Sequence, residues 1–425
     1  MTTNDYREKC EPGTPYKFTS PRYAEIKEGD SRKRCLGYTL TPMREDGEES
    51  ELIEAVPEGE NLAATVTYAE PVRLTWKWAD DYYFTLAQDG EGTVMGPAED
   101  WYASGTEFTL TAAPAKNYEF LCWMGSVSGT NTTVSATIDK PTSVKALFSP
   151  VQQVKSDWEA IEGKPAMMRT VKSLGKTYCV VKFTDSTTFD IPKKVTSIDC
   201  LVVGGGGSGG AKYGGGGGAG GFIYQTGLAV TPEDQLTVTV GAGAAPGGKD
   251  NHGNDGKPTT LELNGQKITA QGGGYGGFNN GNPNKGASGG GAPGNAVGGT
   301  TYLERMGGAS TAVAPEQGNP GGSRPITAIS GKKCGAGGGG AGGKGADVGE
   351  GKGGDGLPSA ITGETVWYAA GGAGGGSDNY KPCDGAANTG NGGAGGTGNA
   401  DYAGGSGVVI IRYALPSQGA MILIF

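Results

Sequence analysis

Long runs of glycine fill most of the second half of the chain and limit what this half can fold into. Most of the 83 glycines lie between Gly204 and Gly407, in runs such as 204–210 and 335–343. Glycine has no side chain to bury and loses more backbone entropy on folding than any other residue. This half is therefore either disordered or ordered by hydrogen bonds between backbone groups.

An extended helix of the polyproline-II type is the ordered structure that suits such runs. It has three residues per turn and no internal hydrogen bonds, so its N–H and C=O groups point outward. Buried backbone groups must be paired, and a bundle of such helices pairs them with one another. The runs lack the strict period and proline content of collagen. We expect a bundle of polyglycine-II helices, with short polar breaks as the reversals.

Apolar strands precede and follow the glycine runs. Alternating or continuous apolar segments predict strands at 177–183, 188–192, 197–203, 221–224, 236–240 and 365–368. A hairpin is expected at 260–269, where Asn264-Gly265 suits a type I′ turn. Residues 408–413 are almost continuously apolar, which is typical of a central strand covered on both faces. Together these strands predict a β-sandwich around the glycine-rich insertion.

The first 150 residues contain two copies of a shorter β pattern. The clearer copy, residues 81–150, has strands expected at 82–86, 108–112, 120–123 and 144–148. The less regular copy, residues 1–80, has strands expected at 16–18, 35–38 and 74–78. Turn residues separate these alternating segments, so each copy is expected to form a small β domain with one buried face. We interpret Trp123 and Trp78 as core aromatics.

The first copy begins almost at Met1 and leaves no room for the opening strand of the second copy. The N-terminus also has no apolar segment of a secretion signal. We therefore expect the chain to be the C-terminal piece of a longer exported protein. The alternative is a complete virion protein that never uses a secretion signal.

The predicted fold class is all-β: two small β repeat domains followed by a β-sandwich with an inserted polyglycine-II helix bundle. The expected divisions are 1–80 (truncated repeat), 81–150 (repeat), 151–170 (polar linker with a helix-like segment at 155–161), 171–415 (glycine-rich sandwich) and 416–425 (tail). No segment is apolar over the roughly 20 residues of a membrane helix, so we expect no integral membrane segment.

Charge and reactive side chains point away from several functions. The net charge of −9 and a pI near 4.9 argue against nucleic acid as a partner, because phosphate binding needs a basic patch. The only histidine is His252, and the seven cysteines include no C-x-x-C pair. We therefore assign no catalytic, cofactor-binding or metal-ligating residue and expect a non-enzymatic protein. Cys334 and Cys383 are candidates for a disulfide.

Two glycine motifs resemble ligand sites and are set aside. Gly204-x-Gly206-x-x-Gly209 fits the dinucleotide fingerprint, but more glycine follows in place of the helix that would hold the pyrophosphate. Residues 342–348 fit one calcium-binding nonapeptide, but such sites need stacked tandem copies and no clear second copy is found. Neither motif predicts a cofactor.

Two segments carry resemblances to known families. Three stretches resemble the two ends of the bacterial and phage glycine-rich domain. They are KFTDSTTFDIP at 182–192, VTSIDCLVVGGGG at 195–207 and GGSGVVIIRY at 404–413. Three segments of the second copy follow one another as in the divergent internalin-type B-repeat: GTEFTLTA at 105–112, FLCWMG at 120–125 and VKALF at 144–148. Cys122 stands where that family prefers glycine. These resemblances imply a repeat stalk and, as in phage tail adhesins, a polyglycine-II module whose tip loops meet a receptor.

The expected function is adhesion or receptor binding at the cell surface or outside the cell. Its expected partner is a host or neighbouring-cell surface protein or glycan, and an oligomer is left open. Candidate contact residues are the bulky or polar ones that interrupt the glycine runs: Tyr213, Phe278, Asn279, Tyr302, Arg305 and Tyr380. The plainer interpretation of each is that it turns the chain or caps the bundle. Two alternative functions are a phage tail-tip adhesin and a structural envelope or matrix component without a specific ligand.

Overall fold

The computed structural model describes residues 13–43, 48–67, 72–249, 251–263, 265–279, 281–294, 306–310, 317–325, 334–376, 382–398 and 401–415. Within these residues every regular element is a β-strand, which confirms the predicted all-β class. The chain divides into two compact units. One contains residues 1–115 and 122–148, and the other contains residues 116–121 and 149–425.

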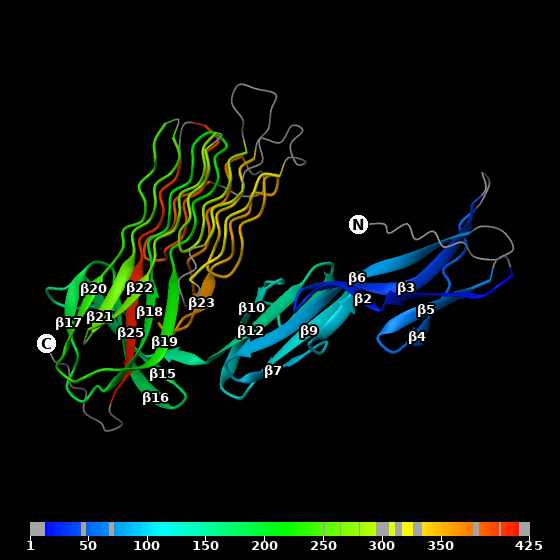
Figure 1. Cartoon of the computed structure of the whole chain (residues 1–425). Coiled ribbons are helices and arrows are strands. Elements are labelled where there is room, and N and C mark those ends of the chain that lie inside the picture. The colour runs from blue at the N-terminus through cyan, green and yellow to red at the C-terminus, as the bar shows by residue number, and fades with distance from the viewer. Residues whose placement is uncertain are drawn as a thin grey trace. The chain divides into compact units, whose positions relative to one another are not determined.

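The repeat region forms three sheets (Figure 1). The first has the order β1-β5-β4, with β1 Tyr16–Pro21, β4 Val56–Glu58 and β5 Asn61–Val66. The second has the order β10-β12-β6-β3-β2 with β8 paired to β6; its strands are β2 Tyr23–Lys27, β3 Ser31–Pro42, β6 Val72–Asp89, β8 Asp100–Ala103, β10 Tyr118–Gly125 and β12 Thr142–Pro150. The third has the order β11-β9-β7, with β7 Gly92–Met95, β9 Thr106–Pro114 and β11 Thr133–Ile138.

Strand β6 runs through both repeat copies. Residues 72–82 pair antiparallel with β3, and residues 84–89 pair parallel with β12. The predicted strands at 74–78 and 82–86 are therefore one continuous strand, and the expected boundary at 80/81 falls inside it. Trp123 is 1% exposed and donates a 2.9 Å hydrogen bond from Nε1 to the carbonyl of Asn131, as a core aromatic should. Trp78 is only half-buried, so the expectation of a second core tryptophan there was wrong.

A buried carboxylate fastens the middle of β6 to its neighbours. The Asp81 side chain is 3% exposed, and Nε of Arg34 lies 3.1 Å from both of its oxygens. Nε of Arg32 donates a further hydrogen bond of 3.3 Å. The Arg32 guanidinium also lies over the rings of Tyr23, at 3.8 Å, and Trp101, at 4.4 Å. Asp81 thus connects β6 to β3, and Arg32 extends the cluster to β2 and β8.

We expect Asp81→Ala to lower the free energy of unfolding by about 2 kcal/mol, because it removes the charge-assisted hydrogen bonds that Arg32 and Arg34 donate in a buried site. Urea denaturation followed by circular dichroism measures this loss. The matched control is Asp80→Ala, which removes an exposed pair with Lys33 and should leave the midpoint almost unchanged. Equal effects of the two substitutions would contradict the importance of the Asp81 cluster.

Two facing sheets form the sandwich of the C-terminal unit. The larger has the order β13-β15-β16-β25-β18-β19 with β14 paired to β15; its strands are β13 Gln152–Val154, β14 Glu159–Ala160, β15 Ala166–Ser173, β16 Lys176–Phe183, β18 Ser197–Val203, β19 Phe222–Ala229 and β25 Val408–Ala414. The smaller has the order β17-β20-β21-β22, with β17 Thr187–Asp190, β20 Gln235–Thr239, β21 Thr259–Leu263 and β22 Gln266–Ala270. Strands β23 Leu357–Ser359 and β24 Val366–Tyr368 form a separate pair.

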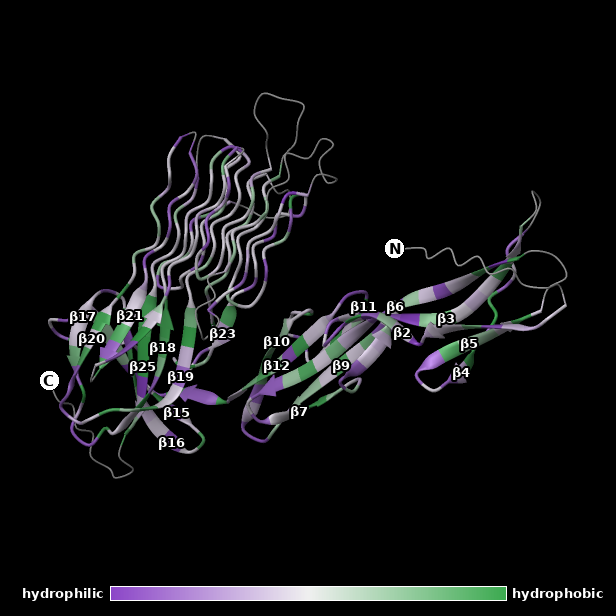
Figure 2. Ribbon diagram, viewed as in Figure 1, coloured by the Kyte–Doolittle hydropathy of each residue, from purple (hydrophilic) through white to green (hydrophobic). Residues whose placement is uncertain are grey.

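Both faces of the larger sheet are covered. On one face Val181, Val202 and Ile411 pack against residues of the smaller sheet such as Leu236 and Leu261. On the other face lie Val180, Leu201, Val203, Val408 and Ile410, covered by Ile361, Tyr368 and Ala369. The apolar strand β25 is therefore central and buried on both sides, as its composition predicts (Figure 2).

The segment 151–170 differs from its prediction as a linker with a helix-like part. It contains β13, β14 and the start of β15, all within the larger sheet, and has no helix. The register places Gln152 opposite Ser173 and Glu159 opposite Met168. Sheet pairing overrides the weak helical preference of 155–161, because the open edge of β15 offers backbone partners. In the predicted hairpin, Gly265 has φ +74° as the turn requires, and Asn264 lies outside the described residues.

The glycine runs rise side by side from one end of the sandwich (Figure 1). Their N–H groups alternate among three neighbouring runs with a period of three. Those of 204, 207 and 210 donate to run 214–221, those of 205, 208 and 211 to run 251–257, and those of 206, 209 and 212 to run 398–405. A chain with three residues per turn produces this pattern, because every third backbone group points in the same direction.

We expect Gly206→Ala to destabilise the C-terminal unit by about 3 kcal/mol or to prevent its folding, because a Cβ there would lie 2.0 Å from the carbonyl oxygen of Asn391. Thermal unfolding measures the effect. The matched control is Gly398→Ala, since a Cβ at this exposed glycine meets no atom within 4 Å. A stable Gly206→Ala variant would show that the runs do not need their close approach.

Candidate functional site

The end of the bundle away from the sandwich is formed by chain reversals (Figure 1). We call this end the distal tip and define it by the described residues 211–213, 251–253 and 275–279. The N–H of Ala211 donates to the carbonyl of Asn251 at 3.2 Å, and that of Gly253 to the carbonyl of Gly276 at 3.2 Å. These hydrogen bonds bring the three reversals together.

The structure places three of the predicted contact residues at the distal tip. Tyr213, with φ +57°, turns the chain; its N–H donates to Gly396 at 2.6 Å and its carbonyl accepts from Gly294 at 2.9 Å. The carbonyl of Phe278 accepts from Gly281 at 2.8 Å, and Asn279 has φ +53°. All three side chains are half-buried. Their backbone roles agree with the plainer interpretation as turn residues, while their side chains remain partly accessible. The other three predicted residues, Tyr302, Arg305 and Tyr380, lie outside the described residues.

Two aromatic rings at the tip were missed among the predicted contact residues. The rings of His252 and Tyr275 stack with centroids 4.3 Å apart and planes 19° from parallel. Asp255 holds the pair in place, because Oδ1 accepts from the N–H of Tyr275 at 3.0 Å and Oδ2 accepts from Nδ2 of Asn284 at 2.7 Å. We call His252 and Tyr275 the tip platform.

The three-residue period explains which side the platform occupies. The N–H groups of Gly273 and Gly276 donate to run 204–210, and those of 274 and 277 donate to run 288–294. Position 275 is neither of these two kinds: its N–H donates to the Asp255 carboxylate and not to a glycine run. A Cβ at Gly272, three residues earlier, would lie 2.0 Å from the carbonyl oxygen of Gly256, and the Tyr275 ring likewise faces the run 251–257, where it stacks on His252. This spacing is a sequence signal that could have identified Tyr275 beside Phe278.

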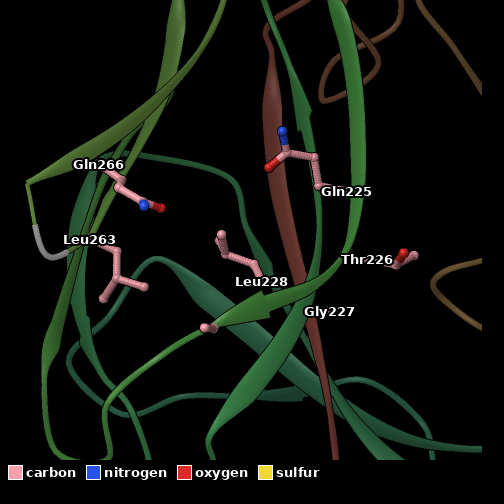
Figure 3. A pocket seen from close by; sticks show the side chains of 7 residues that line it. Gln225, Thr226, Gly227, Leu228, Leu263 and Gln266 are labelled. Carbon is pink, nitrogen blue, oxygen red and sulfur yellow. The ribbon is translucent and has the colours of Figure 1, made fainter.

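A second site is an open cavity of about 480 Å³ beside the two sheets of the sandwich. It is lined by Gln225, Thr226, Gly227, Leu228, Ala229, Leu263 and Gln266. Figure 3 shows Leu228, Leu263 and Gln266 directed toward the gap between the strands. The lining comes from β19, β21 and β22, and both β19 and β22 end their sheets. It offers amides and apolar contacts, and none of these seven side chains is titratable.

The motifs that resemble ligand sites have structural roles here. The Gly204–Gly209 motif runs into the bundle, and no helix follows it in the described chain. In the nonapeptide-like segment, Asp347 accepts from Nζ of Lys344 at 3.2 Å and from the N–H of Ser323 at 2.8 Å. Among the described residues, His, Cys, Asp and Glu form no group of three that could hold a metal ion.

The cysteines that the structure describes are thiols. Cys334 is buried and Cys383 is exposed, so the suggested bridge between them is not formed. The sequence places both cysteines among the glycine runs, but it does not determine whether their two sulfur atoms meet. Burial raises the pKa of the Cys200 thiol to about 12, and it also raises the pKa of Cys179.

We expect iodoacetamide at pH 8 to label Cys383 and to leave Cys200 unmodified in the native protein, because Cys383 is exposed to the reagent, whereas Cys200 is buried and its raised pKa keeps the thiol protonated. Peptide mass spectrometry measures both sites. The pKa of an unfolded cysteine is about 8.5. The contribution of the buried Cys200 thiol to stability is therefore complete below about pH 8.5 and is lost as the pH rises toward 12. Rapid native labelling of Cys200 would contradict its burial.

Comparison with known proteins supports both resemblances at the level of families. Residues 182–414 match the model of the glycine-rich domain, and residues 82–152 match that of the divergent InlB B-repeat domain. The first match covers more than half of the chain, so the chain belongs to the glycine-rich domain family. The second falls on the clearer repeat copy. No curated protein matches the chain. Over its described residues, the structure has no helix long and apolar enough to cross a membrane.

Proposed function

We propose that this chain is a non-enzymatic binding protein of the cell surface or extracellular space. In this proposal the repeat region is a stalk, and the glycine-rich module is a rigid bundle of polyglycine-II helices. The distal tip of the bundle binds a surface protein or glycan of a host or neighbouring cell. The hydrogen-bond period of three in the glycine runs supports the polyglycine-II assignment.

The observation that carries the proposal is where bulky side chains can occur. Inside the bundle a Cβ would meet a neighbouring carbonyl oxygen at about 2 Å, for example at Gly206, Gly209 and Gly216. The reversals escape this limit, and Tyr213, Phe278, Asn279 and His252 lie there. A rigid support that presents bulky side chains at its end is suited to recognition.

The family matches support a surface location for this protein. Divergent InlB B-repeats and glycine-rich domains together point to a surface or extracellular protein, and the B-repeat suggests a bacterial one. Adhesion, export and the identity of the ligand belong to the proposal. A phage tail-tip adhesin is a second form of the same idea, in which the receptor lies on a bacterial host. A component without a specific ligand is the structural alternative.

We expect the fluorescently labelled full chain to bind a panel of bacterial and host cells saturably, and Phe278→Ala to weaken that binding about tenfold. Flow cytometry over a concentration series measures the affinity. The matched control is Tyr224→Ala, which removes a tyrosine that is 42% exposed on strand β19 of the sandwich.

Unsaturable or absent binding by the folded full chain to every cell type would favour the structural alternative. Binding that Tyr224→Ala weakens as much as Phe278→Ala would place the contact on the sandwich instead of the tip. Binding confined to bacterial cells and lost with Phe278→Ala would agree with an adhesin for neighbouring cells and with the phage-type adhesin, and would exclude a host cell as the partner.

A further inference from the structure

The tip platform has an exposed aromatic face. His252 is exposed and Tyr275 is half-buried, so the stack lies at the surface with His252 as its outer ring. The two rings come from different glycine runs that meet through the hydrogen bond from Gly253 to Gly276. A pair of rings held together from two runs is a preformed surface, and little side-chain entropy would be lost when a ligand binds to it.

The backbone around the platform is fixed by close packing. A Cβ at Gly253 would lie 2.3 Å from the carbonyl oxygen of Ser208, and one at Gly276 would lie 2.0 Å from that of Gly215. Neither neighbour can therefore carry a side chain without moving the bundle. The rings of His252 and Tyr275 project from a backbone that the glycine lattice holds in position.

The polar atoms of the platform are arranged for hydrogen bonding to a ligand. Nδ1 of His252 lies 2.7 Å from the carbonyl oxygen of Gly253. A carbonyl oxygen only accepts, so Nδ1 carries a proton, and in the tautomer protonated at Nδ1 alone Nε2 has a lone pair. Within the part of the chain that the structure describes, neither Nε2 of His252 nor the hydroxyl of Tyr275 makes a hydrogen bond.

The charges at the platform favour an uncharged ligand. The platform itself consists of an imidazole ring and a phenol ring. The Asp255 carboxylate beside them already accepts one hydrogen bond on each oxygen. Neither platform residue is a lysine or arginine that would attract an anionic sugar, and a cationic group would have to displace the hydrogen bonds of Asp255.

We propose that His252 and Tyr275 form a carbohydrate subsite for a neutral hexose. The polarised C–H groups of a pyranose ring pack against the open face of the imidazole, because an aromatic face carries negative charge density. Nε2 of His252 accepts from one sugar hydroxyl, and the Tyr275 hydroxyl bonds a second. This inference rests on the proposed function in one respect: it assigns a ligand class to the same distal tip.

The single histidine makes a direct test available. In proton NMR of the full chain, only one set of imidazole C–H resonances exists, and a sugar ring stacked on His252 would shift it. We expect methyl galactoside or methyl glucoside to shift these resonances saturably. Sialyllactose, an acidic glycan, should bind no more tightly than these neutral sugars.

Variants separate the stacking contact from the hydroxyl contact. On a glycan array, His252→Ala should weaken binding to neutral hexose glycans about tenfold, and Tyr275→Phe, which keeps the stacked ring, about threefold. Tyr224→Ala on strand β19 is the matched control and should bind like the natural chain. Thermal unfolding of each variant checks that it remains folded.

The outcomes distinguish this inference from the proposed function. Unshifted imidazole resonances, together with equal binding by His252→Ala, would overturn the subsite even if cell binding remains saturable, and the proposed function would then stand without it. Hexose binding with shifted resonances but no cell binding would support the subsite and contradict the adhesive function. A clear preference for acidic glycans would overturn the assignment of a neutral ligand.

Discussion

Backbone hydrogen bonds between glycine runs are the interaction on which the C-terminal unit depends. Each run donates in turn to three neighbours, as residues 204–212 do to runs 214–221, 251–257 and 398–405. In most globular folds the buried area of side chains offsets the entropy of ordering the chain. The glycine runs bury almost no side-chain area. Buried backbone groups without partners would cost free energy and would exclude such a chain from a dry interior. Pairing of the N–H and C=O groups removes that cost.

The sandwich supplies what the runs lack, an apolar core that sets their starting positions. Strand β18 leads directly into the run that begins at Gly204, and strand β25 follows the run that ends at Gly407. These strands are neighbours in the larger sheet, with Val203 opposite Val408. The start of the first run and the end of the last run therefore lie side by side. Covering that sheet on both faces makes its centre the most buried part of the unit. The order of the strands thus determines which glycine runs become neighbours.

Close packing of glycine also determines where recognition can occur. Carbonyl oxygens of adjacent runs occupy the space that side chains would need, so bulky residues gather at reversals and on the outer side of the bundle. His252 and Tyr275 illustrate this, since His252 lies at a reversal and the half-buried Tyr275 ring stacks on it. Rigidity and variability are thereby separated, because residues at the tip can change without altering the lattice below them.

The sequence by itself determined the all-β class, the central place of strand β25 and the bundle of glycine runs, because periodicity and composition act locally. It also indicated Tyr213 and Phe278 as tip residues, since each interrupts a run. It did not predict that β6 joins the two repeats, that 151–170 adds strands to the sandwich, or that His252 stacks on Tyr275. Only the tertiary structure decided these features. Each depends on which segments, distant in the chain, become neighbours, and that choice follows from long-range packing and pairing of backbone groups.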